Sequence, residues 1–298
     1  MNLYPRLKVT LASLYLRHSP LNIGRWRIIH HILPILREKG ALMGERIVSC
    51  PYDFLYKADL GDWLGQYVYL TGVYEPPTAR IIAHLLNKGD TFIDIGANSG
   101  FFTLLAARQV GSDGQVLSFE PVPAMSTRLK QNLTLNGFSH VKLFNVALSD
   151  TKGVLTLFEG PEGHKGISSL RKIENSIDQI QVKTIPLDEL PDLPRRVNVV
   201  KIDVEGAEQK VLNGMTHLLE RDKPSIVIEI TDDYLSAFGH SAIGLATFLT
   251  SRGYRMYEIG ESGLFPRKPE QAIEQEQFNA LFTCQPIPED LLALSNQT

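Results

Sequence analysis

The chain has 298 residues, of which 43% are hydrophobic and 21% are charged, with two cysteines and a net charge of −3. This length predicts one large domain with extensions or two small domains, and the composition excludes a disordered, collagen-like or disulfide-stapled protein. Cys50 and Cys284 lie far apart in the sequence without a metal-binding spacing. We therefore expect no zinc or redox site, and a reducing compartment.

The charge is unevenly distributed along the chain. Residues 1–50 carry eight Lys or Arg against two Asp or Glu, a net charge of +6, whereas the rest carries 22 against 31, a net charge of −9. The acidic body argues against a nucleic-acid-binding protein. No apolar run approaches the roughly 20 residues that span a bilayer, and the N-terminus lacks a secretory signal pattern, so we expect a cytoplasmic protein.

We expect an N-terminal helical extension, residues 1–70, followed by the main domain, residues 71–298. Leucines recur at helical spacing from Leu3 to Leu14, which predicts an amphipathic helix, and a similar stretch follows at 25–39. One interpretation of this basic segment is a cap that packs on the main domain. The other is a surface that contacts an anionic membrane or a partner.

Strands and helices alternate along most of the main domain. Short apolar runs bounded by turn residues predict strands at 91–95, 116–119, 141–146, 197–202, 225–230, 254–259 and 280–284. Amphipathic stretches predict helices at 101–109, 123–136, 205–219 and 242–252, with an earlier one between Pro76 and Gly89. This alternation indicates a parallel sheet with helices on both faces.

An extended pair interrupts the alternation. Residues 154–158 and 179–185 predict a β-hairpin, with a glycine-rich loop between its strands, in the insertion 151–196. One interpretation is a hairpin without a part in the site. The other is a lid or a wall for the acceptor, because the insertion follows a strand whose carboxyl end should border the ligand.

A glycine-rich turn from Asp94 to Gly100 follows the first of these strands and precedes a helix. Gly96 and Gly100 permit a tight turn and a close approach of the backbone to a ligand. A nicotinamide cofactor would favour glycine where Asn98 stands and no acid at Asp94, because its diphosphate is anionic. The turn favours a cofactor with a cationic amine and a sulfonium, contacted by Asp94, Gly96, Asn98 and Gly100.

Further acids follow the next strands. Glu120 lies 24 residues after Gly96, where a carboxylate accepts hydrogen bonds from ribose hydroxyls. Asp150 either contacts the adenine amino group or forms an Asx turn. Because the carboxyl ends of parallel strands border the ligand crevice, we expect these acids, Asp94 and Asp203 at one edge of the sheet.

Three acids follow the fourth strand within six residues: Asp203, Glu205 and Glu208. We predict that Asp203 accepts a proton from an acceptor hydroxyl, with Glu205 as the second candidate. The two glutamates also have a simpler explanation, because acids in the first turn of a helix are favoured by its dipole. A divalent metal held by Asp203 and Asp232 is an alternative arrangement, and we assign no metal ligand.

Several segments together resemble the FkbM family of S-adenosylmethionine-dependent methyltransferases. They are GVYEP at 72–76, FIDIGANSGFFT at 92–103, FEP at 119–121, VALSD at 146–150 and KIDVEGAE at 201–208. The resemblance covers about residues 72–230. It implies a class I methyltransferase fold, a Rossmann-like α/β sheet of seven strands with the last one reversed. It also implies S-adenosyl-L-methionine as the methyl donor, and often a hydroxyl of a sugar or natural product as the acceptor.

The sequence thus predicts an O-methyltransferase that acts on a small-molecule or glycan acceptor. Methyl transfer to nitrogen or to a carboxylate is an alternative on a similar site. A catalytically silent S-adenosylmethionine-binding scaffold is another, and the acids at every strand end argue against it.

Overall fold

The computed structural model describes residues 16–17, 43–159, 168–169, 179–273 and 275–292. The helices expected at 3–17 and 25–39 lie outside these residues, apart from positions 16–17. Within the described ranges, no helix combines the length and the apolar character needed to cross a membrane.

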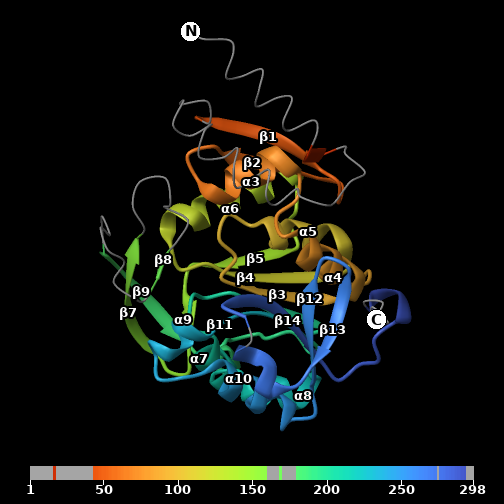
Figure 1. The fold of residues 1–298 in the computed structure, drawn as a ribbon. Helices are drawn as coiled ribbons and strands as arrows, with labels where there is room; N and C mark the ends of the chain where they lie inside the picture. Colours follow the sequence, from red (N-terminus) through yellow and green to blue (C-terminus); the bar gives the residue numbers. More distant parts are fainter. Residues whose placement is uncertain (1–15, 18–42, 160–167, 170–178, 274, 293–298) are drawn as a thin grey trace.

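An eight-stranded, mostly parallel sheet forms the centre of the molecule, in the order β13-β12-β14-β11-β10-β3-β4-β5 (Figure 1). Its strands are β3 (Thr91–Ile95), β4 (Gln115–Phe119), β5 (Val141–Phe144), β10 (Val199–Ile202), β11 (Ser225–Thr231), β12 (Arg255–Gly260), β13 (Gly263–Arg267) and β14 (Gln277–Thr283). Strand β14 is antiparallel to both of its neighbours, β11 and β12. The expected class I methyltransferase sheet with a reversed strand is confirmed, but it has eight strands where seven were expected.

One strand was not predicted. Strand β13 folds back antiparallel on β12, with Gly260 opposite Gly263, and adds an eighth strand at the edge of the sheet. Its run of five residues, GLFPR, contains a proline, and proline in a strand is confined to edges. The same proline hides the strand from a search for apolar runs.

Two layers of helices cover the sheet, as the continuous apolar strands require. The helices are α3 (Trp63–Thr71), α4 (Pro76–Leu85), α5 (Phe101–Val110), α6 (Pro123–Asn136), α7 (Glu208–Asn213), α8 (Thr216–Asp222), α9 (Asp232–Ser236) and α10 (Ala242–Thr250). Three short 3₁₀ helices complete them: η1 (Leu187–Glu189), η2 (Pro269–Ile273) and η3 (Glu289–Leu291). Apolar side chains of α3, α4, α5 and α6 form one hydrophobic cluster, and those of α7, α8 and α10 form another.

A hairpin of β1 (Glu45–Cys50) and β2 (Phe54–Asp59) lies beyond α5 and α6, on the same side of the sheet (Figure 1). The sequence analysis expected a helical extension over residues 1–70 and predicted no strand in it, so this hairpin differs from the expectation. Residues on both sides of position 70 share one hydrophobic cluster, in which Tyr56 and Leu70 are buried together with Phe101 and Leu104.

The single helix expected at 205–219 was wrong. The chain forms α7 and α8 instead, and the first of these begins only at Glu208. Glu205 and Gly206 have positive φ angles of 55° and 104°, which no α-helix accommodates. The break falls at Gly214, where a Cβ atom would lie 2.0 Å from the backbone oxygen of Ser149.

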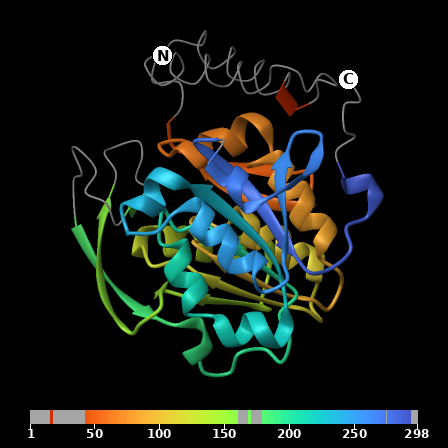
Figure 2. The same ribbon diagram turned by 60° about the horizontal axis from the view of Figure 1, so that its bottom comes forward.

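The expected β-hairpin insertion is confirmed. Strands β7 (Gly153–Glu159) and β9 (Gln179–Ile185) pair antiparallel, and β6 (Ala147–Leu148) and β8 (Ser168–Ser169) extend them to a four-stranded sheet. This sheet stands at one side of the molecule (Figures 1 and 2). Leu157 of β7 and Val182 of β9 pack on Val122 and Met125 at the start of α6.

Candidate functional site

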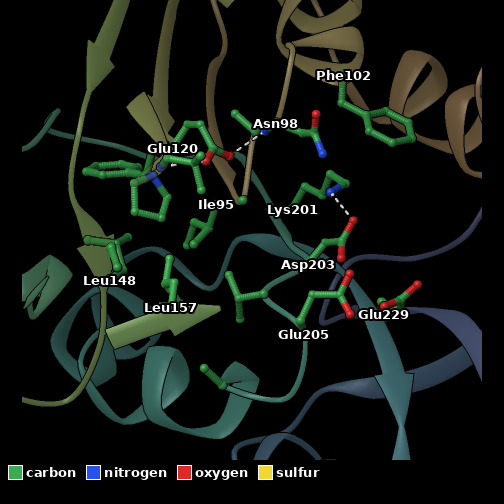
Figure 3. Close-up of a pocket in the computed structure, with 18 of the residues that line it drawn as sticks. Ile95, Asn98, Phe102, Glu120, Leu148, Leu157, Lys201, Asp203, Glu205 and Glu229 are labelled. Carbon is green, nitrogen blue, oxygen red and sulfur yellow. Dashed lines mark hydrogen bonds and ion pairs between the residues drawn. The ribbon is translucent and has the colours of Figure 1, made fainter. Parts of the chain in front are cut away.

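A cavity of about 380 Å³ opens at the carboxyl ends of β3, β4, β10 and β11. Small-molecule sites commonly have volumes of about 300–1,000 Å³. Figure 3 shows two ends of this cavity. At the first, which we call the Glu120 end, Glu120 lies near Leu148 and Leu157. At the second, the acidic end, Lys201 contacts Asp203, and Glu205 and Glu229 lie beyond Asp203.

The Glu120 carboxylate is held by the glycine-rich turn. Its Oε2 accepts a hydrogen bond from the backbone N–H of Asn98 at 2.7 Å, and its Oε1 accepts one from Val122 at 2.8 Å. Asn98 has a φ of 50°, a left-handed conformation that asparagine tolerates better than most residues. Burial raises the pKa of Glu120 to about 7, and the two backbone donors oppose that shift.

The two glycines of the turn are required by packing within the protein. A Cβ atom on Gly96 would lie 1.8 Å from the backbone oxygen of Asp203, and one on Gly100 would lie 2.1 Å from Leu129 Cδ1. Gly96 lines the cavity, whereas Gly100 does not. The bare backbone at Gly96 therefore lets the turn touch the end of β10, which brings the two parts of the site together.

Asp94 is buried behind the cavity and does not line it. Its Oδ2 accepts a hydrogen bond from Thr103 Oγ1 at 2.6 Å. Asp94 lies opposite Lys201 in the register of β3 and β10. Burial raises the pKa of Asp94, and the Lys201 ammonium opposes this shift.

Asp150 is exposed and is not among the residues that line the cavity. Its Oδ1 accepts a hydrogen bond from Ser149 Oγ at 3.2 Å. The cavity reaches the preceding strand β6 through Ala147 and Leu148. A contact between Asp150 and adenine stays a prediction.

Lys201 is the buried cation of the acidic end. Its Nζ donates to Asp203 Oδ2 at 3.0 Å and lies 5.0 Å from the centre of the Phe102 ring (Figure 3). The Lys201 side chain is only 5% exposed, and that of Asp203 is 25% exposed. Burial lowers the pKa of Lys201, but the carboxylates of Asp203, Asp94 and Glu75 raise it more, so the net shift is upward.

Two more carboxyl groups complete the acidic end. Burial raises the pKa of Glu205 to about 8, and the charges of Asp203 and Glu208 add to that shift. Burial and the charge of Asp203 also raise the pKa of Glu229 well above its usual value. Gln277 Nε2 donates to Glu229 Oε1, and this contact exists because the reversed strand β14 starts beside the end of β11.

The structure does not bring Asp203 and Asp232 together in the cavity. Asp232 Oδ1 accepts a hydrogen bond from the backbone N–H of Ala242 at 2.7 Å, and Asp232 does not line the cavity. Across the described part of the chain, no group of three or more His, Cys, Asp or Glu is placed to hold a metal ion.

The sequence analysis missed several residues of the cavity. Lys201 and Glu229 interrupt the apolar runs of two buried strands, and a lone charge in such a run is a signal that could have identified them. The others lie outside the βα units: Asp62, Trp63, Tyr74 and Gln277. Tyr74 lies in the GVYEP segment that carries part of the family resemblance, whereas no local pattern marks the other three, because the fold alone brings them to the cavity.

The lining of the cavity fits S-adenosylmethionine. Apolar side chains at the Glu120 end offer a surface for an adenine ring: Phe119, Val122, Leu148, Leu155 and Leu157. The lining has five carboxyl groups against one lysine, and carboxyl groups that ionise beside a cation suit a cationic donor. The β-sheet order and this cavity define a class I S-adenosylmethionine-dependent methyltransferase.

Comparison with known proteins supports the assignment to the methyltransferases. The profile of the methyltransferase FkbM domain matches residues 94–256. Methyltransferase 1 of Beauveria bassiana is 28% identical over 221 residues, which are 61% of this chain and 85% of that protein. The hexuronic acid methyltransferase AglP of Haloferax volcanii is 28% identical over 148 residues, which are 49% of this chain and 58% of that protein.

Among solved structures, methyltransferase FkbM from Methylobacillus flagellatus is 15% identical, with a TM-score of 0.46, over 85% of this chain and 59% of that one. The domain match extends over more than half of the chain. The chain belongs to the FkbM methyltransferase family.

Proposed function

We propose that this protein transfers a methyl group from S-adenosylmethionine to a hydroxyl oxygen of a sugar or another small polyhydroxylated molecule. The observation that carries the proposal is the acidic end of the cavity, where Asp203, Glu205 and Glu229 line the space away from Glu120. Carboxyl groups beside aromatic rings, here Tyr74 and Tyr234, suit hydroxyl groups as ligands. The relative AglP, a hexuronic acid methyltransferase by name, supports a sugar acceptor.

We assign the binding of the donor to the Glu120 end. We expect the Glu120 carboxylate to accept hydrogen bonds from ribose hydroxyls, and Gly96 and Asn98 line the same cavity. S-adenosylmethionine, when bound, supplies an activated methyl group. Asp203 and Glu205 are then left for the acceptor.

We assign the proton of the acceptor hydroxyl to Asp203. A carboxylate is too weak a base to deprotonate a sugar hydroxyl beforehand, but it accepts the proton as the oxygen becomes acidic in the transition state. Lys201 compensates the charge of Asp203 and fixes the carboxylate through a 3.0 Å hydrogen bond. Glu205 is the second candidate, although with a pKa of about 8 it holds its own proton at neutral pH.

The test is an incubation of the purified protein with methyl-deuterated S-adenosylmethionine and matched acceptors. A neutral methyl glycoside, its amino-sugar counterpart and its uronate counterpart differ in a single group, and mass spectrometry locates the label. Label on a hydroxyl oxygen supports the proposal. Label on nitrogen or on the uronate carboxyl would replace it with one of the other transfer reactions. Binding of the donor without transfer to any acceptor would favour a silent scaffold.

A further inference from the structure

The segment of β1, β2 and α3, residues 45–71, precedes the region that matches the family domain, which begins at residue 94. We call it the hairpin–helix segment. It contributes Asp62, Trp63 and Leu64 to the lining of the cavity, in addition to the contacts of β2 described below. The domain that the family shares therefore does not form the whole wall of this cavity.

Strand β2 is hydrogen-bonded to the glycine-rich turn near its end, at the residue before Gly100. The hydroxyl of Tyr56 and Ser99 Oγ lie 2.6 Å apart. Tyr56 is 1% exposed and Ser99 is 4% exposed, so water cannot replace either partner. The Tyr56 ring also packs edge-on against Phe101, the first residue of α5.

A second connection runs from β2 through α6 to the same residue. The backbone N–H of Lys57 donates to Asn132 Oδ1 at 2.7 Å, and Asn132 Nδ2 donates to the backbone oxygen of Ser99 at 2.9 Å. Asn132 is fully buried. Tyr56 of β2 thus fixes the side chain of Ser99, and Asn132 of α6, which accepts from the next residue of β2, fixes its backbone.

Ser99 is linked to Glu120 through one residue. Its backbone N–H donates to Asn98 Oδ1 at 2.7 Å, and the backbone N–H of Asn98 donates to Glu120 Oε2. Asn98 needs this support, because its φ of 50° is unfavourable for a residue with a side chain. A shift of Ser99 would release Asn98 and, with it, one of the two donors that hold Glu120.

We propose that Tyr56 is a positioning residue for the binding of the methyl donor. Through Ser99 and Asn98, Tyr56 holds the glycine-rich turn and Glu120 in their binding geometry. The hairpin–helix segment is then part of the donor site in this protein, although it lies before the family domain. This role requires only donor binding and is independent of the acceptor.

The test is the affinity for S-adenosylhomocysteine, measured by titration calorimetry, in Tyr56→Phe. The substitution removes one hydroxyl and keeps the ring, and a lost hydrogen bond of about 0.5–1.5 kcal/mol corresponds to a 2- to 13-fold weaker affinity. The matched control is Tyr254→Phe. Tyr254 is also buried, its hydroxyl has no hydrogen-bond partner among the described residues, and it lies outside the cavity lining. The Tyr254→Phe variant should bind S-adenosylhomocysteine with the same affinity as the unaltered protein.

A double-mutant cycle with Ser99→Ala separates positioning from general support of the fold. If Tyr56 acts through Ser99, the double variant binds no more weakly than either single variant. Unchanged affinity in Tyr56→Phe, with only a lower unfolding temperature, would overturn the proposal. The proposal would also be overturned if the loss of affinity in the double variant equalled the product of the losses in the two single variants. If Tyr56→Phe does not fold, Ser99→Ala decides alone, because it breaks the same contact from the side of the turn.

Discussion

Lys201 and Asp203 are two residues apart at the end of β10, and their side chains form the ion pair at the acidic end of the cavity. The same ammonium lies beside Asp94 and Glu75, whose charges raise its pKa. One lysine therefore compensates several carboxyl groups that belong to three separate elements of the fold. This arrangement explains how a buried strand tolerates a lysine. It also predicts that replacing Lys201 destabilises the fold.

Lys201→Met should lower the free energy of unfolding by about 3 kcal/mol at neutral pH, because it leaves buried carboxylates without their counter-charge. The value is at the lower end of the usual range because Asp203 is 25% exposed. Urea denaturation measures the change. Lys201→Met combined with Asp203→Asn should recover part of the loss. A single variant as stable as the unaltered protein would show that the pair is not needed for the fold.

Asp203→Asn should reduce turnover by roughly 10²–10⁴-fold, because the amide cannot accept the proton of the acceptor hydroxyl. The affinity for the donor should change little, since Glu120 stands at the other end of the cavity. The matched control is Asp232→Asn, outside the cavity, which should keep its turnover. Steady-state rates with the acceptor found above measure both. The loss of turnover should be the same with and without a chelator. Normal turnover in Asp203→Asn would mean that Asp203 does not accept the proton, and Glu205 would become the candidate.

The central strands of the sheet could be predicted from the sequence because they are buried on both faces. Each therefore reads as a short apolar run, and Thr91–Ile95 has the bounds that the sequence predicts. Helix Pro123–Asn136 also has its predicted bounds, because Pro123 and Gly137 mark its ends.

The hairpin–helix segment was missed for a local reason. In β2, Phe54, Tyr56 and Ala58 are buried, but Leu55 between them is exposed and equally apolar, which hides the alternation. The contacts of the acidic end could not be predicted for a different reason. Gln277 meets Glu229 only because β14 is inserted antiparallel beside β11, and such pairing over 48 positions leaves no local pattern.

Gly96→Ala should destabilise the fold more than Gly89→Ala does. Both glycines have a positive φ, 79° and 84°, so each substitution pays about 1–2 kcal/mol for a left-handed conformation. Only Gly96 adds a clash, with the backbone oxygen of Asp203, whereas a Cβ atom on Gly89 would meet nothing within 4 Å. Chemical denaturation compares the two variants. Equal losses would contradict the close contact between the glycine-rich turn and β10.

The acid groups of the cavity should make stability depend on pH. The pKa of Glu120 is raised from 4.5 to about 7 and that of Glu205 from 4.5 to about 8 by burial. A folded-state pKa above the unfolded value means that the folded protein holds the proton more tightly. The stability from these two groups is therefore fully present below about pH 4.5 and is lost as the pH rises through about 7 and 8. Thermal unfolding of the ligand-free protein across this range should show that fall, and Glu205→Gln should remove its upper part.

Binding of the donor should lower the raised pKa of Glu120. A cationic sulfonium favours the ionised form of nearby carboxyl groups, and ribose hydroxyls donate to a carboxylate. Binding of S-adenosylmethionine should therefore release protons near about pH 6.5, where Glu120, with a pKa of about 7, is mostly protonated in the free protein. Calorimetry in two buffers of different ionisation enthalpy measures the released protons directly. Glu120→Gln, which cannot ionise, should release fewer protons and bind the donor more weakly. Proton uptake on binding, or release that is unchanged in Glu120→Gln, would mean that Glu120 is not the group that meets the donor.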